Sequence, residues 1–135
     1  MGIIKLLGKH MNIDRLMETP GEHLYIFSIC LSFNKTGGVD TVYFSDIKSE
    51  NLKKIVNSDR DLTKAARLLD FKKEFANKLV IFPIILKRDG DWRINNQDEF
   101  INGILTMWPK LNLNDQSKPA VLLDPFINRY MEVKN

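Results

Sequence analysis

Apolar and polar positions alternate most regularly in the segment that begins at Leu24. Over Leu24–Phe33, every second position places a large apolar side chain on one face of an extended chain: Tyr25, Phe27, Ile29, Leu31 and Phe33. Asn34, Gly37 and Gly38 then supply turn residues, and Val39–Phe44 resumes an extended pattern rich in β-branched and aromatic residues. The pattern predicts an antiparallel hairpin whose first strand turns that apolar face toward the core.

Three segments before residue 79 carry apolar positions at helical spacing. A short helix is predicted over 9–17. The second helix begins at Asp46 or Ser49, either of which can cap its first turn, and runs to about Val56. The third begins after Asp59 and runs to roughly Lys78, with an inward face formed by Leu62, Ala65, Ala66, Leu69 and Phe75.

A fourth helix is predicted to begin at Asn96, because Asn96 with Glu99 resembles a capping box. Pro109 stops this helix, since proline cannot continue the helical hydrogen bonds. We expect its apolar stripe to lie in the core, and the stripe consists of Phe100, Ile101, Ile104, Leu105 and Trp108. After a polar connection, 120–123 predicts one more buried strand.

Residues 79–86 form a continuous apolar run of strand length, which is typical of a central, buried strand. Pro83 cannot donate a hydrogen bond to a neighbouring strand and therefore favours an edge or a bulge. Both interpretations stay open at this point. Asp89 and Gly90 separate the run from 92–94, and this pair is a strong signal for the tight turn of a second hairpin.

Together these elements predict one α+β domain spanning 1–135. Its antiparallel sheet would contain about four to five strands, built from two hairpins and covered by about three to four helices. The chain has 135 residues, of which 44% are hydrophobic and 27% charged, and this composition fits a single domain with its own core. We expect the two ends, 1–8 and 132–135, to be mobile.

Cysteine content and the N-terminal segment indicate where the protein works. Cys30 is the single cysteine, so the chain cannot form an internal disulfide, and a reducing compartment is expected. The apolar residues near the N-terminus are interrupted by Lys5, Lys9 and His10, and the segment is too short and charged for a signal peptide or membrane span. We therefore expect a cytoplasmic protein without membrane contact.

The chain carries no motif for nucleophilic or cofactor-dependent catalysis. His10 and His23 are the two histidines and lie outside any nucleophile motif, and the paired glycines at 37 and 38 lack the further residues of a phosphate loop. The leading interpretation therefore includes no catalytic residue, no metal ligand and no cofactor. One alternative is a metal-dependent enzyme acting on phosphodiesters, with its carboxylates supplied by Asp40, Asp46 and Glu50.

The formal net charge of +3 attracts phosphate groups, and the cations gather between Lys48 and Lys78. Arg60, Lys64 and Arg67 follow helical spacing and would form one stripe. A nucleic-acid-binding domain is therefore a second hypothesis, with phosphate contacts from Lys53, Lys54, Arg60, Lys64, Arg67, Lys72 and Lys73. Interleaved acidic residues, and the lack of an aromatic series beside the cations, favour a solvated surface instead.

The leading hypothesis is a non-catalytic protein-protein interaction module with an accessory, adaptor or inhibitor-like role. A small domain with a full core and no catalytic constellation usually acts by binding, so another protein is the expected partner. We expect the contact residues near the C-terminal end, at Phe126, Tyr130 and Met131, with lysines around them. A homodimer through an exposed strand or through the apolar ends of the chain is a further hypothesis.

Overall fold

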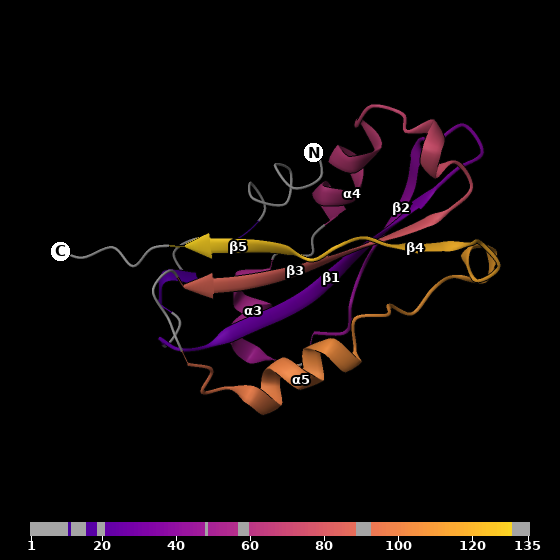
Figure 1. The fold of residues 1–135 in the computed structure, drawn as a ribbon. Helices are drawn as coiled ribbons and strands as arrows, with labels where there is room; N and C mark the ends of the chain where they lie inside the picture. Colours follow the sequence, from indigo (N-terminus) through magenta and orange to yellow (C-terminus); the bar gives the residue numbers. More distant parts are fainter. Residues whose placement is uncertain are drawn as a thin grey trace.

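The computed structural model describes Met11 and residues 16–18, 21–47, 49–56, 60–88 and 93–130. The strands are β1 (Leu24–Phe33), β2 (Val39–Phe44), β3 (Leu79–Arg88), β4 (Ala120–Leu122) and β5 (Phe126–Tyr130). The helices are α3 (Glu50–Ile55), α4 (Arg60–Arg67), α5 (Gln97–Leu105) and the short 3-10 helices η1 (Lys73–Phe75) and η2 (Leu113–Asp115). Helices α3 and α4 lie on one side of the sheet and α5 on the other (Figure 1). The predicted mobile ends, 1–8 and 132–135, lie outside the described residues.

The five strands form one mixed sheet, which confirms the α+β class but corrects the purely antiparallel arrangement. The strand order is β2-β1-β3-β4, and β5 also pairs with β3. Strand β1 runs antiparallel to both neighbours, whereas β4 and β5 run parallel to β3. Parallel strands need a long crossover, and the chain supplies it through α5 and η2. The described residues form three α-helices, the low end of the predicted number.

The β1–β2 hairpin is present as predicted, and the Asn34 side chain organises its turn. Its Oδ1 atom accepts hydrogen bonds from the backbone N–H groups of Thr36 and Gly38, each at 3.0 Å. Gly37 has φ +89, a left-handed conformation that glycine adopts without strain. The second predicted hairpin is wrong in its described part, because Arg93 and Ile94 belong to no strand; 89–92 lie outside the described residues.

Pro83 lies in the middle of β3, opposite Ser28 of β1. The backbone N–H and C=O of Ser28 both bond to Ser45, on the side away from β3. In an antiparallel pair, the backbone N–H and C=O groups of two opposed residues either bond to each other or both point to the outer side of the pair. Those of Ser28 point away from β3, so the backbone nitrogen of Pro83 points away from β1, toward β4 and β5. Residues 123–125 link those two strands there, and the ladder is interrupted. Strand β3 is therefore central, and the proline occupies a gap in its outer pairing.

Both faces of β1 are buried. The face predicted for the core packs against α3 and α4, with Tyr25, Phe27, Ile29, Leu31 and Phe33 all buried. On the other face Ser28 donates a hydrogen bond to the carbonyl of Met107, and Ser32 donates one to Asp115 at 2.7 Å. The segment after α5 therefore lies along this second face and covers it.

Two predicted helices differ from the structure. Helix α4 ends at Arg67 instead of near Lys78, because the chain beyond it pairs with the hairpin turn: Lys72 N–H donates to the Gly37 carbonyl at 2.9 Å. The helix predicted over 9–17 does not include Met11, which forms an isolated antiparallel bridge with Val56. Residues 16 and 17 are helical, and the rest of that range lies outside the described residues.

Ser49 begins α3, which confirms one of the two predicted caps. Its Oγ atom accepts a hydrogen bond from the backbone N–H of Leu52 at 3.2 Å. Asn96 precedes α5 but makes no side-chain cap. Its amide group bonds instead to the backbone N–H and C=O of Leu24, each at 2.8 Å, as a neighbouring strand would. The start of α5 is therefore tied to the start of β1.

Gly103 brings α5 very close to the sheet. A Cβ atom at this position would lie 2.6 Å from Ile26 Cγ2 and 2.7 Å from the Ile26 carbonyl oxygen. Because one of these atoms belongs to the backbone of β1, it cannot move aside easily. The absence of a side chain at Gly103 therefore sets the distance between α5 and β1.

The variant Gly103→Ala tests this contact. In a helix alanine is more favourable than glycine by about 1 kcal/mol, so without crowding this substitution would raise the free energy of unfolding. We expect a loss of about 1–3 kcal/mol in the free energy of unfolding, because the added methyl group overpacks the interface. Urea denaturation measures the change. Asn102→Ala, on the neighbouring exposed position, is the matched control and should be neutral or slightly stabilising; a stabilised Gly103→Ala would contradict the close contact.

Candidate functional site

Helix α5 turns much of its apolar side toward solvent. Ile101 lies two residues before Gly103 and Leu105 two residues after it, so both side chains point about 160° away from the sheet contact. They are 51% and 75% exposed, Ile104 is 43% exposed, and Trp108 just beyond the helix is 59% exposed. The expectation that this stripe lies in the core is therefore wrong for these four residues. Of the predicted stripe, Phe100 is partly buried.

The other flank of α5 shows why the stripe faces outward. Glu99, Asn102 and Thr106 line a cavity with the loop after β2 and with α3, at the part of β1 that β2 does not cover. Since this flank faces the β2 side, the opposite flank of the helix faces the β3–β5 side of the sheet. Ile104 and Trp108 therefore lie on the flank next to the open part of the sheet, whereas Ile101 and Leu105 point outward into solvent.

Strands β4 and β5 add two apolar side chains to the same side of the molecule. Leu122 is the register partner of Ile81, and Ile127 is the partner of Ile85. Ile81 and Ile85 are paired in turn with Cys30 and Ile26, which face α5 and the segment after it. Leu122 is 62% and Ile127 46% exposed. The strand predicted over 120–123 is present at Ala120–Leu122, but it is not buried.

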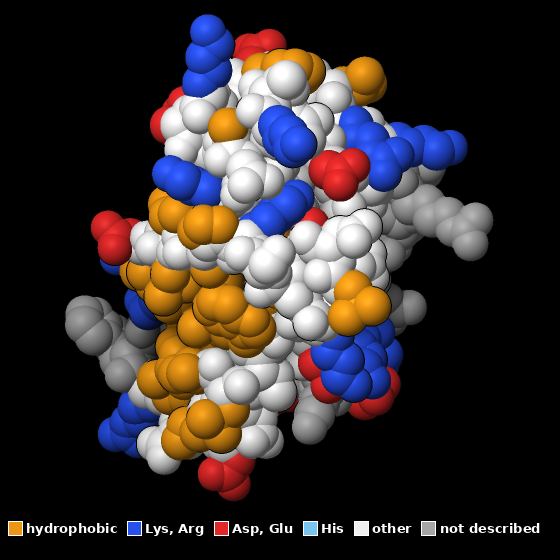
Figure 2. Space-filling model, turned by 90° about the vertical axis from the view of Figure 1, so that its right-hand side faces the viewer, with side chains coloured by type: hydrophobic (Ala, Val, Ile, Leu, Met, Phe, Trp, Pro, Cys, Tyr) orange, Lys and Arg blue, Asp and Glu red, His pale blue; other side chains and the backbone are white. Residues whose placement is uncertain are grey.

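We call these exposed residues the apolar face: Ile101, Ile104, Leu105, Trp108, Leu122 and Ile127. Figure 2 shows hydrophobic side chains gathered into one area in its left and lower part. Contiguous exposed apolar surface in a folded domain is typical of sites that bind another molecule. The apolar face is therefore the strongest candidate site among the described residues.

The C-terminal residues predicted to bind a partner lie close to this face but do not form it. Phe126 is 43% exposed and precedes Ile127 in β5, so its side chain points to the opposite face of the sheet. Tyr130 ends β5, and its side chain lies outside the described part of the structure, as does the whole of Met131. The prediction of a C-terminal contact thus stays a prediction.

The predicted phosphate contacts are spread over several elements. Lys53 and Lys54 are exposed on α3, where Lys53 pairs with Glu50 at 3.4 Å. Lys64 and Arg67 lie on α4, and the Arg60 side chain lies outside the described part. Lys72 and Lys73 follow α4 and are not on the same helix as Lys64. The stripe expected on one long helix is therefore divided.

A smaller group of cations does come together around the β1–β2 turn. Arg67 Nε donates to the Asp40 carbonyl at 2.9 Å, and Lys72 is held to Gly37. Phe71, which the sequence analysis did not single out, lies against Gly38 and is 62% exposed. An aromatic residue directly before two lysines is the sequence signal that could have identified Phe71 as a candidate for stacking on a nucleic-acid base. We call Arg67, Phe71, Lys72 and Lys73 the basic tip.

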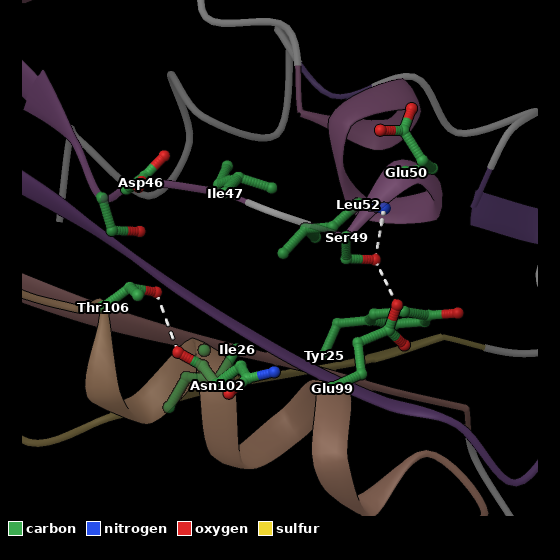
Figure 3. Close-up of a pocket in the computed structure, with 12 residues that line it drawn as sticks. Tyr25, Ile26, Asp46, Ile47, Ser49, Glu50, Leu52, Glu99, Asn102 and Thr106 are labelled. Carbon is green, nitrogen blue, oxygen red and sulfur yellow. Dashed lines mark hydrogen bonds between the residues drawn. The ribbon is translucent and has the colours of Figure 1, made fainter.

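The carboxylates proposed for a metal site do not converge. Asp46 and Glu50 line a cavity of about 460 Å³ together with Glu99, but Asp40 lies outside it. Figure 3 shows Glu50 pointing away from Glu99, whose carboxylate accepts a hydrogen bond from Ser49. Within the described residues, no group of three or more His, Cys, Asp or Glu side chains could hold a metal ion. The cavity is a hollow at the edge of β1 whose lining mixes polar and apolar side chains.

A buried ion pair lies beneath the segment that follows α5. Asp115 accepts hydrogen bonds from Ser32 and Tyr43, and its Oδ1 lies 2.9 Å from Lys118 Nζ. Lys118 also donates to Ser32 Oγ at 2.7 Å and to the Phe33 carbonyl at 3.1 Å. Every charge in this group is thus partnered, and the group ties η2 to β1 and β2.

The pKa values in this group favour a structural role. Burial acts to raise the pKa of Asp115, but hydrogen bonds from Tyr43, Ser32 and Lys118, with the Lys118 charge, outweigh it and lower that pKa. Burial and the neighbouring Asp115 raise the pKa of Cys30 to about 12, and burial with the Asp115 hydrogen bond raises the pKa of Tyr43 to about 12. Cys30 therefore stays a protonated thiol at neutral pH, and the thiolate needed for nucleophilic attack does not form.

Comparison with family models, with curated proteins and with solved structures gave no match for this chain. The helices formed by the described residues include none that is long and apolar enough to span a membrane.

The variant Asp115→Asn tests the role of the buried ion pair. It leaves the Lys118 charge without its counter-ion, so we expect the free energy of unfolding at pH 7 to fall by about 3 kcal/mol. Because the pKa of Asp115 is lowered by folding, its carboxylate stabilises the native protein above the ordinary aspartate pKa of about 3.9. This contribution is lost as the pH falls through the folded-state value.

Urea denaturation at a series of pH values measures both effects. We expect the gap in stability between the wild-type protein and Asp115→Asn to narrow below about pH 4. The double variant Asp115→Asn with Lys118→Met is the control, and it should recover part of the loss because no buried charge remains. A gap that stays constant down to pH 2 would show that folding does not lower the pKa of Asp115, and a gap that widens below about pH 4 would show that this carboxyl is uncharged in the native protein.

Proposed function

We propose that this protein is a non-catalytic interaction module that binds another protein through the apolar face. The single observation that carries the proposal is the orientation of α5, which leaves Leu105 75% exposed and Trp108 59% exposed. A surface helix normally turns its apolar stripe inward. The proposal includes a cytoplasmic location, which the single, buried Cys30 supports because its thiol requires no oxidising compartment.

Energetics support the same proposal. Burying a large apolar side chain contributes roughly 1.5–3 kcal/mol, and the free protein forgoes much of this at each exposed position of the apolar face. Tryptophan is also among the residues that contribute most to binding when a partner encloses it. A partner that covers Trp108 and its neighbours on α5 would recover this free energy. The arrangement of Asp40, Asp46 and Glu50 gives no comparable support to a metal-dependent enzyme.

Site-specific photo-crosslinking tests the proposal in the source cell. With a photoreactive amino acid in place of Leu105, we expect illumination to yield a discrete adduct with one protein, because the partner would cover this position. The matched control carries the same amino acid at Glu74, which is exposed on η1 and remote in sequence from the apolar face. Adducts that are equal at the two positions, or absent at both, would contradict the proposal.

The variant Leu105→Glu separates binding from folding. Because Leu105 is exposed, this change should alter the free energy of unfolding by no more than about 0.5 kcal/mol. With the photoreactive group moved to Trp108, the variant should lose the adduct while its thermal unfolding is unchanged. An adduct that persists would show that binding does not depend on Leu105, which would contradict the apolar face as the contact surface.

A second candidate function is nucleic-acid binding at the basic tip. The observation that favours it is the exposed ring of Phe71, which directly precedes Lys72 and Lys73. Single-stranded nucleic acids bind where aromatic rings stack on bases beside cations that contact phosphates. Asp70 and Glu74 lie next to these residues in sequence and reduce the local positive charge, so this function ranks second.

Fluorescence anisotropy with labelled single-stranded DNA and RNA tests the basic tip. We expect affinity to fall steeply between roughly 0.05 M and 0.2 M salt, because phosphate contacts release bound counter-ions. Replacing Lys72 and Lys73 together by alanine should reduce the salt slope by about 1.4, and Phe71→Ala should weaken binding by about 1–3 kcal/mol. The double variant Lys53→Ala with Lys54→Ala, on α3, is the control. No binding at low salt would exclude this function.

A further inference from the structure

We propose that the occupant of the apolar face is an acidic amphipathic segment of the partner protein, with apolar side chains followed by carboxylates at one end. The inference rests on the proposed function and adds the chemistry of the partner. It is carried by two neighbouring cations, Lys87 and Arg129, that lie at one end of the exposed sheet surface.

The sheet register places these cations. Lys87 of β3 is the partner of Arg129 in β5, and each follows an isoleucine of the open surface by two residues: Ile85 and Ile127. Residues two apart in a strand share a face, so both cations lie on the same face as Ile127. Adjacent strands lie about 4.8 Å apart, which makes the two cations close neighbours.

Neither cation has a counter-ion in the described part of the structure. Lys87 and Arg129 form no ion pair or hydrogen bond there, and the exposed carboxylates Asp98 and Asp124 form none either. Like charges directly opposite each other on neighbouring strands destabilise a sheet. A carboxylate from outside would relieve this repulsion. Near the opposite end of β3, Lys118 already forms an ion pair with Asp115 and therefore needs no carboxylate from a partner.

The dimensions of the surface fit a short helix. Ile81, the register partner of Leu122, and Lys87 are six residues apart on β3, which corresponds to about 20 Å. A helix of about 13 residues has this length. Such a helix could place apolar residues against Leu122, Ile127 and the outward flank of α5, and its acidic end at Lys87 and Arg129. A basic segment would meet repulsion at the same end.

Selection from a library of random linear peptides of about 13 residues tests this inference. The wild-type protein is the bait, and the Leu105→Glu and Trp108→Glu variants are run in parallel. We expect the enriched peptides to combine apolar residues with a net negative charge and to fail on both variants. Near-ultraviolet circular dichroism checks that each variant is folded.

An enriched peptide is then synthesised and its dissociation constant is measured against charge variants. We expect Lys87→Glu with Arg129→Glu to weaken binding about tenfold or more, through two lost ion pairs and new repulsion. Lys53→Glu with Lys54→Glu, on α3, makes the same change in net charge away from the apolar face and should leave the affinity within about twofold.

The other outcomes overturn the inference in distinguishable ways. Peptides that need Leu105 but are neutral or basic, or that bind the Lys87 and Arg129 variant equally well, would reject the acidic partner and leave the proposed function intact. Enrichment that does not depend on Leu105, or no enrichment, would reject both. Self-association of the protein that Leu105→Glu abolishes would show that a second copy occupies the face, which also rejects the acidic partner.

Discussion

The close contact between Gly103 and Ile26 is the constraint on which the surface of this protein depends. Because a helix can approach a strand this closely at a residue without a side chain, one flank of α5 is held against β1. Because the helix is rigid, this contact at Gly103 fixes the direction in which every other side chain of α5 points. Ile101 and Leu105 face solvent for the same geometrical reason that Gly103 faces the sheet.

Strand β3 gives the sheet its two halves. It pairs antiparallel with β1 along its whole length, and its other edge is shared by two short parallel strands. Pro83 lies opposite the gap between β4 and β5, where β3 has no strand partner. Proline suits this position because its nitrogen carries no hydrogen, so no backbone donor is left without a hydrogen bond. The antiparallel half is covered on both faces, whereas the parallel half leaves Leu122 and Ile127 open. The exposed apolar surface thus lies where the sheet is least covered.

Local signals in the sequence predict a large part of the fold. The turn at Asn34, the cap at Ser49 and the alternation along Leu24–Phe33 act within a few residues, and each matches the structure. The parallel pairing of β4 and β5 with β3 was missed, because it joins segments that lie far apart along the chain. Helical periodicity identified α5 but assigned its stripe to the core, since periodicity cannot tell which side of a helix a glycine will hold against a strand.

The buried ion pair of Asp115 and Lys118 shows a further limit of sequence analysis. The segment around it is polar and was interpreted as a connection, yet both side chains lie beneath the surface. A signal was present in Ser28 and Ser32, because hydroxyl groups on a strand between apolar residues need hydrogen-bond partners when they are buried. The sequence does not show which distant residues supply those partners.

The central claim is that the apolar side of α5 faces water in the free protein, and the fluorescence of Trp108 tests it most directly. In a Trp92→Phe variant, Trp108 is the single tryptophan and reports its own surroundings. The account predicts emission typical of a solvent-exposed indole and efficient quenching by iodide, since this residue is 59% exposed. Blue-shifted emission that resists iodide would show that Trp108 is enclosed, and the apolar face would then not exist as described.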